Sequence, residues 1–247
     1  MKERYVAVEW PAPPRVRALM TTRFGGVSVA PYDSFNLAAH CGDDARAVAT
    51  NRAVLTRDGV PQPVWLEQVH GVDVVDAATA SGVPRADASF VRVAGVGCAV
   101  LVADCLPVLI CDRAATVVAA AHCGWRGLAR GVLTATVKRL EVPSGDLVAW
   151  LGPAIGQRRY EVGDDVRDAF VGVRAGAAVA FVRGAAPNKW HADLYALARA
   201  ELASLGVAAI YGGGFCTFDE RRFYSYRRDV TTGRMAAVIW LSDAEAP

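Results

Sequence analysis

The chain has 247 residues, with a hydrophobic fraction of 53% and a formal net charge of +2. This length and apolar content allow a substantial core in one large domain or two small ones. The nearly balanced charge argues against a nucleic-acid-binding surface and against a polybasic membrane-binding surface.

No linker, internal repeat or low-complexity run separates two halves of the chain, and we expect a single domain over residues 1–247. No apolar run reaches the ~18 residues that span a bilayer. The N-terminus is charged, is interrupted by prolines and lacks the apolar segment of a secretory signal. These features predict a cytoplasmic protein whose six cysteines are reduced thiols, metal ligands or a nucleophile rather than disulfides.

The first predicted elements are a strand and a helix. Residues 16–28 predict a strand that ends in a Gly-Gly loop. Residues 43–59 predict a helix, because Asp43 or Asp44 can cap its start and Gly59 can stop it.

The middle of the chain predicts several apolar strands. Residues 63–71 predict a strand with His70 at its end, and 87–93 predict another. Residues 97–112 predict two strands that are interrupted near Pro107, which has no backbone donor for a sheet ladder.

Residues 116–122 are continuously apolar up to a histidine, as expected for a strand covered on both faces. Residues 124–140 have apolar positions near helical spacing and predict one helix. The remaining predicted elements are a strand in 147–156, helices in 164–172 and 192–206, a strand in 207–215, and a basic loop before a final strand in 221–241. Because strands and helices alternate without a regular βαβ repeat, we expect an α/β (α+β) domain with a mixed sheet and helices packed outside.

Three residues in this pattern are candidate metal ligands. His70 and His122 each end an apolar segment close to a glycine, and Cys105 lies at the predicted strand break. Strand ends and the loops after them carry the reacting groups in many α/β folds. Two imidazoles and one thiolate can bind zinc and leave one position open. The sequence separations match no local zinc-finger code, so only the fold can bring the three together.

A phosphate-binding feature is predicted next to His122. A helix that starts at Gly124 directs its free N–H groups toward the end of the preceding strand, and such groups attract anions. Arg126 can add a bidentate phosphate contact. In the alternative interpretation, Trp125 packs on the core and Arg126 is solvated.

Two polar loops are further candidates. Arg23, Asn36 and His40 stand among glycines and aromatic residues, where they can line a pocket or satisfy loop backbone. The segment FYSYRRD at 223–229 places Arg227 beside tyrosines that can stack on a base, although an amphipathic strand with a charged rim explains the same pattern.

Seven segments occur in a characteristic order: TTRFGGVS, NLAAHCGDD, QVHG, ADCLPVLI, AAHCGWRGL, GPAIG with YEVG, and FYSYRRD with TGRMA. Together they closely resemble the YfiH-like family, which is also called the multicopper polyphenol oxidase or laccase-domain family, the purine nucleoside phosphorylase family and the peptidoglycan editing factor family. The resemblance runs from about Arg17 to Leu241.

The resemblance implies a single mixed α/β domain and a metal-binding set on His70, Cys105 and His122. It also implies zinc, phosphorolysis of adenosine, inosine, guanosine and methylthioadenosine, and adenosine deamination as a further activity. Many relatives have HAGWRG where this chain has HCGWRG, which raises the question whether Cys123 is a second thiolate in the site.

The family name multicopper polyphenol oxidase implies copper as the alternative to zinc. A set of two histidines and one cysteine can form a blue-copper site. A laccase reaction also needs a separate histidine-rich copper cluster, and only His40 and His191 remain after His70 and His122. The histidine count therefore disfavours a multicopper polyphenol oxidase.

Two other classes stay open. In a metal-free hydrolase, Cys105 is the nucleophile, His122 or His70 is the base, and Asp104 or Gln68 orients the base. In a nucleotide-binding or scaffold protein, the zinc is structural, but such sites usually close with four protein ligands and only three are apparent.

The candidate ligands and the resemblance together favour a zinc-dependent enzyme, and the resemblance implies a transferase and hydrolase whose partners are purine nucleosides and inorganic phosphate. The candidate phosphate ligands are Arg23, Arg126 and Arg227. The candidate contacts to ribose or base are Asn36, Gln68 and Asp104. The preferred base and the oligomeric state do not follow from the sequence.

Overall fold

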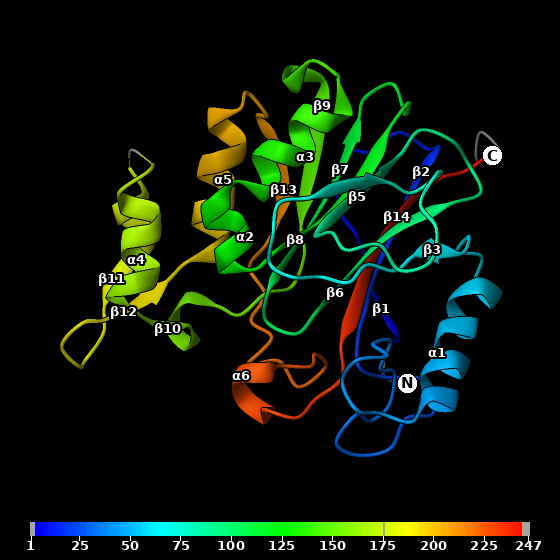
Figure 1. The fold of residues 1–247 in the computed structure, drawn as a ribbon, viewed down its shortest axis with the longest axis horizontal. Coiled ribbons are helices and arrows are strands. Elements are labelled where there is room, and N and C mark those ends of the chain that lie inside the picture. Colours follow the sequence, from blue (N-terminus) through cyan, green and yellow to red (C-terminus); the bar gives the residue numbers. More distant parts are fainter. Residues whose placement is uncertain (1–2, 175, 244–247) are drawn as a thin grey trace.

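The computed structural model describes residues 3–174 and 176–243, which form three β-sheets and the helices packed on them (Figure 1). The five-stranded sheet contains, in spatial order, β1 (Tyr5–Val6), β2 (Val16–Thr21), β14 (Met235–Leu241), β6 (Gly97–Val102) and β3 (Pro63–Val64). The six-stranded sheet contains β13 (Ala209–Gly212), β9 (Leu147–Leu151), β7 (Leu106–Asp112), β8 (Val118–Cys123), β5 (Ala88–Val91) and β4 (Val74–Asp76).

The helices are α1 (Ala45–Arg57), α2 (Trp125–Arg130), α3 (Val132–Leu140), α4 (Asp164–Val171), α5 (Leu194–Ser204) and α6 (Tyr226–Asp229). Three short 3₁₀ helices cover Ser144–Asp146, Gln157–Arg159 and Ala177–Ala180. Among the described residues, no helix is long and apolar enough to cross a membrane.

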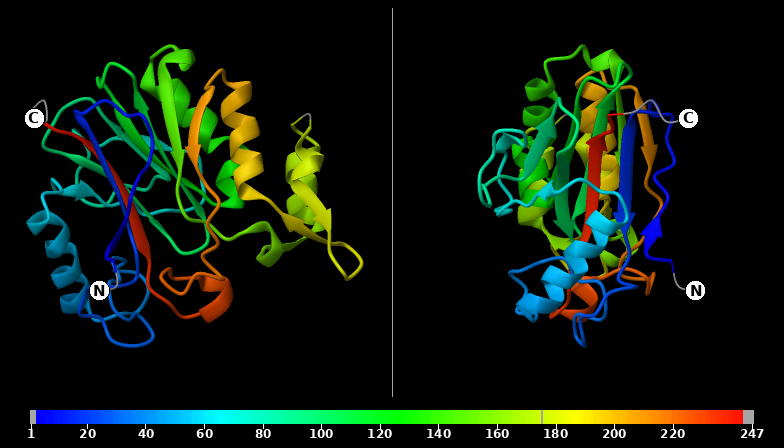
Figure 2. Two further views of the ribbon diagram at one scale, coloured as in Figure 1. Left: turned by 180° about the vertical axis from the view of Figure 1, so that it is seen from behind. Right: turned by 90° about the vertical axis from the view of Figure 1, so that its right-hand side faces the viewer.

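The two large sheets face each other across a shared apolar core. Met20 and Ile239 of the five-stranded sheet pack into the same cluster as Leu109 and Trp150 of the six-stranded sheet. A second core lies between the six-stranded sheet and helices α2, α3 and α5, and a third lies under α1. Figure 2 shows α1 on a different side of the paired sheets from α2, α3 and α5. The result is a helix–sheet–sheet–helix arrangement.

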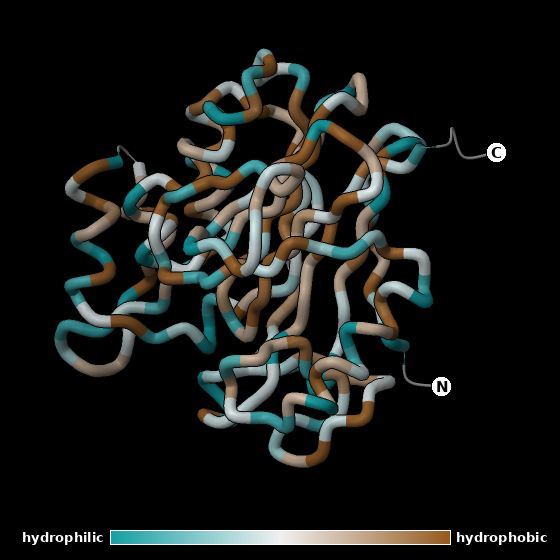
Figure 3. The backbone as a smooth tube through the Cα atoms, turned by 45° about the vertical axis from the view of Figure 1, so that its right-hand side comes forward, coloured by the Kyte–Doolittle hydropathy of each residue, from teal (hydrophilic) through white to brown (hydrophobic). Residues whose placement is uncertain are grey.

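The apolar strands predicted from the sequence form the centre of this arrangement. Every residue of β6, β7 and β8 is buried. The facing sheet covers one face of β7 and β8 and the helices cover the other, whereas β6 lies between the six-stranded sheet and α1. Figure 3 shows the same contrast, with hydrophobic segments along the central strands and hydrophilic segments in the outer loops. Both large sheets combine parallel and antiparallel pairs. The prediction of a mixed α/β fold is confirmed, although the strands divide between two facing sheets.

A small lobe extends from the main body beside α5. Strands β10 (Glu161–Gly163), β12 (Lys189–Ala192) and β11 (Phe181–Arg183) form an antiparallel sheet, and α4 packs on it (Figure 1). The sequence predicted α4 but none of these three strands, because each has only three or four residues.

The helix predicted over residues 124–140 is two helices. Gly131 adopts a left-handed conformation with φ of 94°, which ends α2 and begins α3. Glu201 of α5 then accepts hydrogen bonds from the backbone N and Oγ1 of Thr134 in the first turn of α3. The N-cap of α1, by contrast, is Asp44, one of the two predicted residues.

Pro107 lies inside β7, whereas the sequence predicted a break there. It is the second residue of the strand, and the ladder from β7 to β9 begins only at Val108. The missing N–H therefore removes no bond to β9. The interruption falls at residues 103–105, where Asp104 has φ of 89°.

Candidate metal centre and active-site cavity

The structure brings His70, Cys105 and His122 together. Their ligand atoms all lie within 4.8 Å of one another, and Cys105 Sγ is 3.7 Å from His70 Nε2. His122 is on β8, Cys105 precedes β7, and His70 lies in the loop after β3. Because β7 and β8 are paired neighbours, the ends of these strands place Cys105 beside His122.

Asp87 connects the two histidines. Its Oδ1 is 2.8 Å from His122 Nδ1, and its carboxylate accepts hydrogen bonds from the backbone N–H groups of Val69, His70 and Gly71 at 2.6–3.1 Å. The His122 backbone N–H also donates to the Asp87 carbonyl oxygen. A carboxylate that binds one imidazole nitrogen leaves the other nitrogen for a metal and fixes the ring.

This carboxylate also explains why His70 is not at the end of a strand, as the sequence predicted. The N–H groups of residues 69–71 bond to Asp87 instead of to a neighbouring strand. His70 adopts φ of 58°, and Asp104 beside Cys105 adopts φ of 89°. Such conformations are uncommon for non-glycine residues and cluster at functional sites.

The short HCGWRG segment follows from close packing at Gly124. A Cβ atom at this position would lie 2.4 Å from His70 Cδ2, 2.9 Å from His70 Nε2 and 3.1 Å from Cys105 Sγ. Only glycine lets the backbone after His122 pass against the imidazole of His70. The segment after β8 therefore forms one wall of the ligand cluster.

The electrostatics of the cluster favour a thiolate. Burial alone would raise the pKa of the Cys105 thiol, but His122 and His70 lower it to about 6. Burial alone would lower the pKa of His122, but Cys105 and Asp87 raise it to about 9. Burial alone would also raise the pKa of Asp87, yet hydrogen bonds from His122 and Gly71 hold it below its ordinary value.

The donor set fits a zinc ion. Tetrahedral zinc with Zn–N of 2.0–2.1 Å and Zn–S of about 2.3 Å places N and S ligands about 3.6 Å apart, and Cys105 Sγ lies 3.7 Å from His70 Nε2. Three protein ligands leave one position for a further ligand, as in catalytic zinc sites. Within residues 3–174 and 176–243, this is the one group of three or more His, Cys, Asp or Glu side chains with such spacing.

Cys123 does not join the cluster. It follows His122 on β8, so its side chain points to the opposite face and packs in the core under the helices. Its Sγ lies 3.9 Å from the Ala121 carbonyl oxygen. Burial raises the pKa of the Cys123 thiol well above its ordinary value. None of the six cysteines, all of which lie in the described residues, is in a disulfide.

The three candidate ligands line a cavity of about 510 Å³. This volume is typical of small-molecule sites. Four of the other predicted site residues line it, namely Gln68, Asp104, Arg126 and Arg227. The other lining residues include His40 and Tyr226, which belong to the two polar loops named as further candidates, and Tyr160 and Arg234, which the sequence did not single out.

Gln68 and Asp104 are already engaged by the protein. Gln68 donates to the Leu101 carbonyl oxygen and accepts from the Leu101 N–H, like a strand neighbour of β6. Asp104 accepts from Thr217 Oγ1 and from the Arg227 N–H, both at 2.6 Å. These side chains hold the cavity wall in place, and Asp104 fixes the segment that carries Arg227.

The cationic side chains of the cavity are braced in different ways. The Arg126 guanidinium lies 4.4 Å from the ring centroid of Trp125. Arg227 donates to the Glu161 carbonyl oxygen and lies 5.3 Å from the ring centroid of Tyr160. Trp125 also packs against the core and Arg126 is exposed, as in the alternative interpretation. Phosphate binding by Arg126 stays a prediction. The cavity therefore offers a polar ligand the positive charges of Arg126 and Arg227 together with the aromatic rings that lie beside them.

Arg23 and Asn36, which the sequence analysis placed among the substrate contacts, do not line this cavity. Arg23 donates to the carbonyl oxygen and to Oδ1 of Asp33, and its guanidinium lies over Tyr224. Asn36 is fully buried and bonds to Ala38, among other groups. Both residues organise loop backbone, which was the alternative interpretation of this region.

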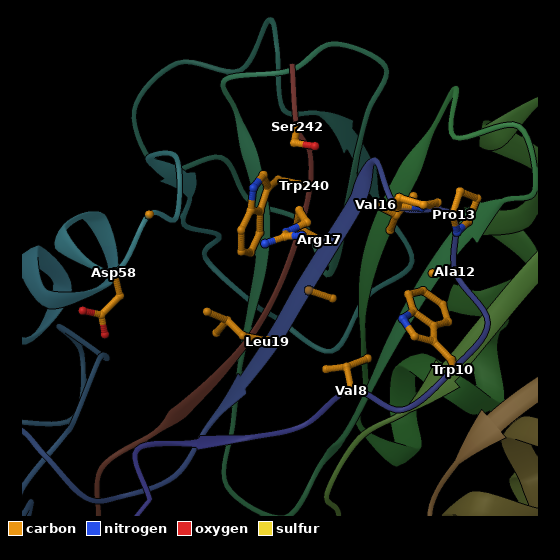
Figure 4. A pocket seen from close by; sticks show the side chains of 13 residues that line it. Val8, Trp10, Ala12, Pro13, Val16, Arg17, Leu19, Asp58, Trp240 and Ser242 are labelled. Carbon is orange, nitrogen blue, oxygen red and sulfur yellow. The ribbon is translucent and has the colours of Figure 1, made fainter. Parts of the chain in front are cut away.

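A larger groove of about 710 Å³ lies elsewhere, along β2 and the N-terminal segment (Figure 4). Trp10 and Trp240 lie on opposite sides of β2 in this view, and Asp58 stands at the far end. Asp58 is bonded to Arg4 and Tyr5. The groove holds no cluster of metal-ligating side chains, as far as the described residues go, so volume alone does not locate the chemistry.

The fold and the site thus define a mixed α/β protein with a His-Cys-His candidate metal centre in a cavity lined by arginines. A family model described as multi-copper polyphenol oxidoreductase laccase matches residues 17–242, and the chain belongs to this family. The resemblance seen in the sequence is confirmed.

The chain is similar to a purine nucleoside phosphorylase of Pseudomonas aeruginosa, with 58% identity over 97% of this chain and 99% of the relative. It is 53% identical to the purine nucleoside phosphorylase YfiH of Escherichia coli over 96% of this chain and 99% of the relative. A solved structure of a Neisseria meningitidis protein matches with a TM-score of 0.94 and 52% identity, covering 97% of this chain and all of that chain. YlmD of Geobacillus stearothermophilus matches with a TM-score of 0.86 and 34% identity, covering 94% of each chain.

Proposed function

We propose that this protein is a zinc-dependent purine nucleoside phosphorylase, an enzyme that transfers the ribosyl group of adenosine, inosine, guanosine or methylthioadenosine to inorganic phosphate. The observation that carries the proposal is the three-ligand cluster at the wall of a 510 Å³ cavity that also presents arginine side chains. The names of the two relatives that are more than half identical support the reaction class.

His70, Cys105 and His122 are the proposed zinc ligands, and a bound zinc supplies a Lewis acid next to the substrate. Asp87 is a positioning residue, because it fixes the His122 ring and the backbone around His70. The low pKa of Cys105 favours the thiolate form that a metal requires.

The remaining cavity residues hold the two substrates. Arg126 and Arg227 can bind phosphate oxygens with charge-assisted hydrogen bonds. The rings of Tyr160 and Tyr226 offer apolar faces for a purine base. Bringing phosphate and nucleoside into one cavity replaces an encounter in solution by a fixed approach of the phosphate oxygen to the ribose C1′.

Adenosine deamination is a second proposed reaction of the same cavity. It uses the same nucleoside but takes water in place of phosphate, and it releases ammonia from C6 of the base. The partition between the two reactions then depends on the phosphate concentration.

The decisive assay incubates the purified protein with adenosine or inosine, with and without inorganic phosphate, and separates the products. We expect free base and ribose 1-phosphate only when phosphate is present, and inosine from adenosine in either case. Base without ribose 1-phosphate would indicate hydrolysis instead, and no turnover of any purine nucleoside would contradict the proposal.

A metal-free cysteine hydrolase is a second candidate that one observation favours. Cys105, His122 and Asp87 form a chain of nucleophile, base and orienting carboxylate, with Asp87 in the role that Asp104 or Gln68 was expected to take. A Cys105→Ala variant that loses activity but keeps bound zinc would support this reading. Loss of zinc together with activity supports the ligand role.

Copper and polyphenol oxidation are not favoured. His40 lines the same cavity, and His191 lies on β12 in the small lobe, so the two remaining histidines do not form a second cluster. An oxidase that reduces oxygen needs such a cluster beside the first copper. Elemental analysis distinguishes the metals, since stoichiometric copper in the purified protein would restore the oxidase hypothesis.

A further inference from the structure

Two loops that are far apart in the sequence meet at the edge of the cavity through one buried amide. Asn36 Oδ1 accepts hydrogen bonds from the backbone N–H groups of Ala38 and Arg234, and Asn36 Nδ2 donates to the Ala38 carbonyl oxygen. The Leu37 N–H donates to the Arg234 carbonyl oxygen. The loop that carries His40 and the segment that leads into β14 are therefore joined by hydrogen bonds into one unit.

Close packing fixes this unit further. A Cβ atom at Gly233 would lie 2.8 Å from Asn36 Cβ and 2.8 Å from Tyr224 Cζ, so the segment before Arg234 packs directly on both residues. The backbone of Arg234 thus has a defined position relative to the cavity before any ligand binds.

The Arg234 guanidinium is held by neutral groups only. Its Nη1 donates to the carbonyl oxygens of Thr232 and Gly233 at 2.8 and 3.1 Å, and the guanidinium lies 5.7 Å from the ring centroid of Tyr226. Among the described residues, no carboxylate forms an ion pair with it. The carboxylate of Asp104, which lines the same cavity, accepts hydrogen bonds from Thr217 Oγ1 and from the Arg227 N–H, and not from Arg234.

His40 lies on the wall of this cavity and of a smaller adjoining cavity. Burial lowers the pKa of His40, and the charges of Arg234 on the loop before β14 and Arg52 on α1 lower it further. A neutral imidazole offers one N–H donor, and Arg234, which lines the same cavity, adds guanidinium donors that have no ion pair among the described residues. Such donors in a region of positive potential favour an anion.

We propose that Arg234 and His40 form a binding subsite for inorganic phosphate in this cavity. The inference rests on the proposed function, because it takes phosphate as the co-substrate, and it adds two residues that the sequence analysis did not include among the phosphate ligands. Asn36 is the positioning residue of the subsite, since it holds the backbone around both.

Phosphate binding to the zinc-loaded protein in the absence of nucleoside tests the subsite directly. We compare wild type, Arg234→Gln, Arg234→Lys and a control, Arg46→Gln, by isothermal titration with inorganic phosphate. Arg46 is an exposed arginine on α1 outside the cavity. Loss of a charge-assisted contact should weaken phosphate binding at least about tenfold in Arg234→Gln, with partial recovery in Arg234→Lys and no change in the control.

A titration of the His40 ring by NMR gives a second readout. Bound phosphate should raise the pKa of His40 in wild type and leave it unchanged in Arg234→Gln, whose folding is verified by thermal unfolding. If Arg234→Gln does not fold, His40→Gln takes its place in the binding assay. Phosphate affinity within twofold of wild type in every folded variant would overturn the inference.

Adenosine 5′-monophosphate is titrated in parallel, because a nucleotide presents the same phosphate chemistry. Binding of the nucleotide but not of inorganic phosphate through Arg234 would also overturn the inference. Phosphate binding that depends on Arg234 without any ribose 1-phosphate formation would contradict the proposed function and leave the subsite intact. Phosphorolysis with an unchanged KM for phosphate in Arg234→Gln would do the reverse.

Discussion

Replacing Gly124 with alanine is expected to disrupt the metal centre without a backbone penalty. Gly124 has φ of −64° and ψ of 154°, which alanine adopts freely. The effect is therefore steric. The added Cβ would lie 2.4 Å from His70 Cδ2, whereas carbon atoms in contact are about 3.5–4.0 Å apart. The His70 ring must move by about 1 Å to restore this contact distance.

A movement of this size is large on the scale of metal coordination. Ligand distances in metal sites hold within about 0.2 Å, so a displaced His70 ceases to be a ligand in the original geometry. Loss of an outer-shell partner costs about 10–100-fold in metal affinity, and we expect Gly124→Ala to weaken zinc binding by at least that much. Crowding of the packed site should also destabilise the fold by about 1–3 kcal/mol.

Zinc affinity is measured by competition with a chromophoric chelator, and stability by chemical unfolding with and without zinc. Gly145→Ala is the matched control, because a Cβ at Gly145 meets no atom within 4 Å. Wild-type zinc affinity in Gly124→Ala, with His70 still bound to the metal, would refute the steric reasoning.

Three other substitutions test the surroundings of the site. Asp87→Asn should destabilise the metal-free protein by about 3–5 kcal/mol in urea unfolding, because it removes the carboxylate partner of a buried pair. Because the pKa of Asp87 is lowered in the folded state, the stability that Asp87 contributes is present above its unfolded-state pKa and is lost as the pH falls through the folded-state value. Asp87→Asn should therefore lose less stability in acid than wild type does. The same dependence of the unfolding free energy on pH in both proteins would contradict this role of Asp87. Cys123→Ala should keep one zinc per chain by elemental analysis and lose about 1 kcal/mol of stability, whereas loss of zinc would make Cys123 a ligand. Asn36→Ala should cost about 1–3 kcal/mol because it leaves buried backbone groups unpaired, and it should raise the KM for phosphate without releasing zinc; a normal KM would separate Asn36 from the cavity.

Much of the fold was predictable because burial leaves a clear pattern in this chain. The long apolar runs of β6 to β8 and the capped helix α1 were located from composition and capping residues. The division of the strands into two facing sheets was not predictable. A strand covered on both faces has the same continuous apolar sequence whether helices or a second sheet cover it.

The three candidate ligands were located by their positions at segment ends and by the family resemblance. Asp87 was missed, because nothing in the predicted strand 87–93, which it begins, indicates that the N–H groups of residues 69–71 bond to its carboxylate. Its one signal was an acidic residue directly before a buried strand, where an unpaired charge is costly.

Arg23 and Asn36 were placed in the site because polar residues in glycine-rich loops read alike whether they point into a cavity or into their own loop. Asn36 is nevertheless linked to the cavity, since it holds the backbone of Arg234. Arg234 itself was missed, because nothing in the local sequence distinguishes it from a solvated arginine.

A crystal of the protein as purified, measured with X-rays at the zinc absorption edge, tests the central claim most directly. We predict one anomalous peak about 2.0–2.1 Å from a nitrogen of His70 and of His122 and about 2.3 Å from Cys105 Sγ. An anomalous signal at the copper edge alone, or no peak between these three side chains, would contradict a zinc centre in this protein.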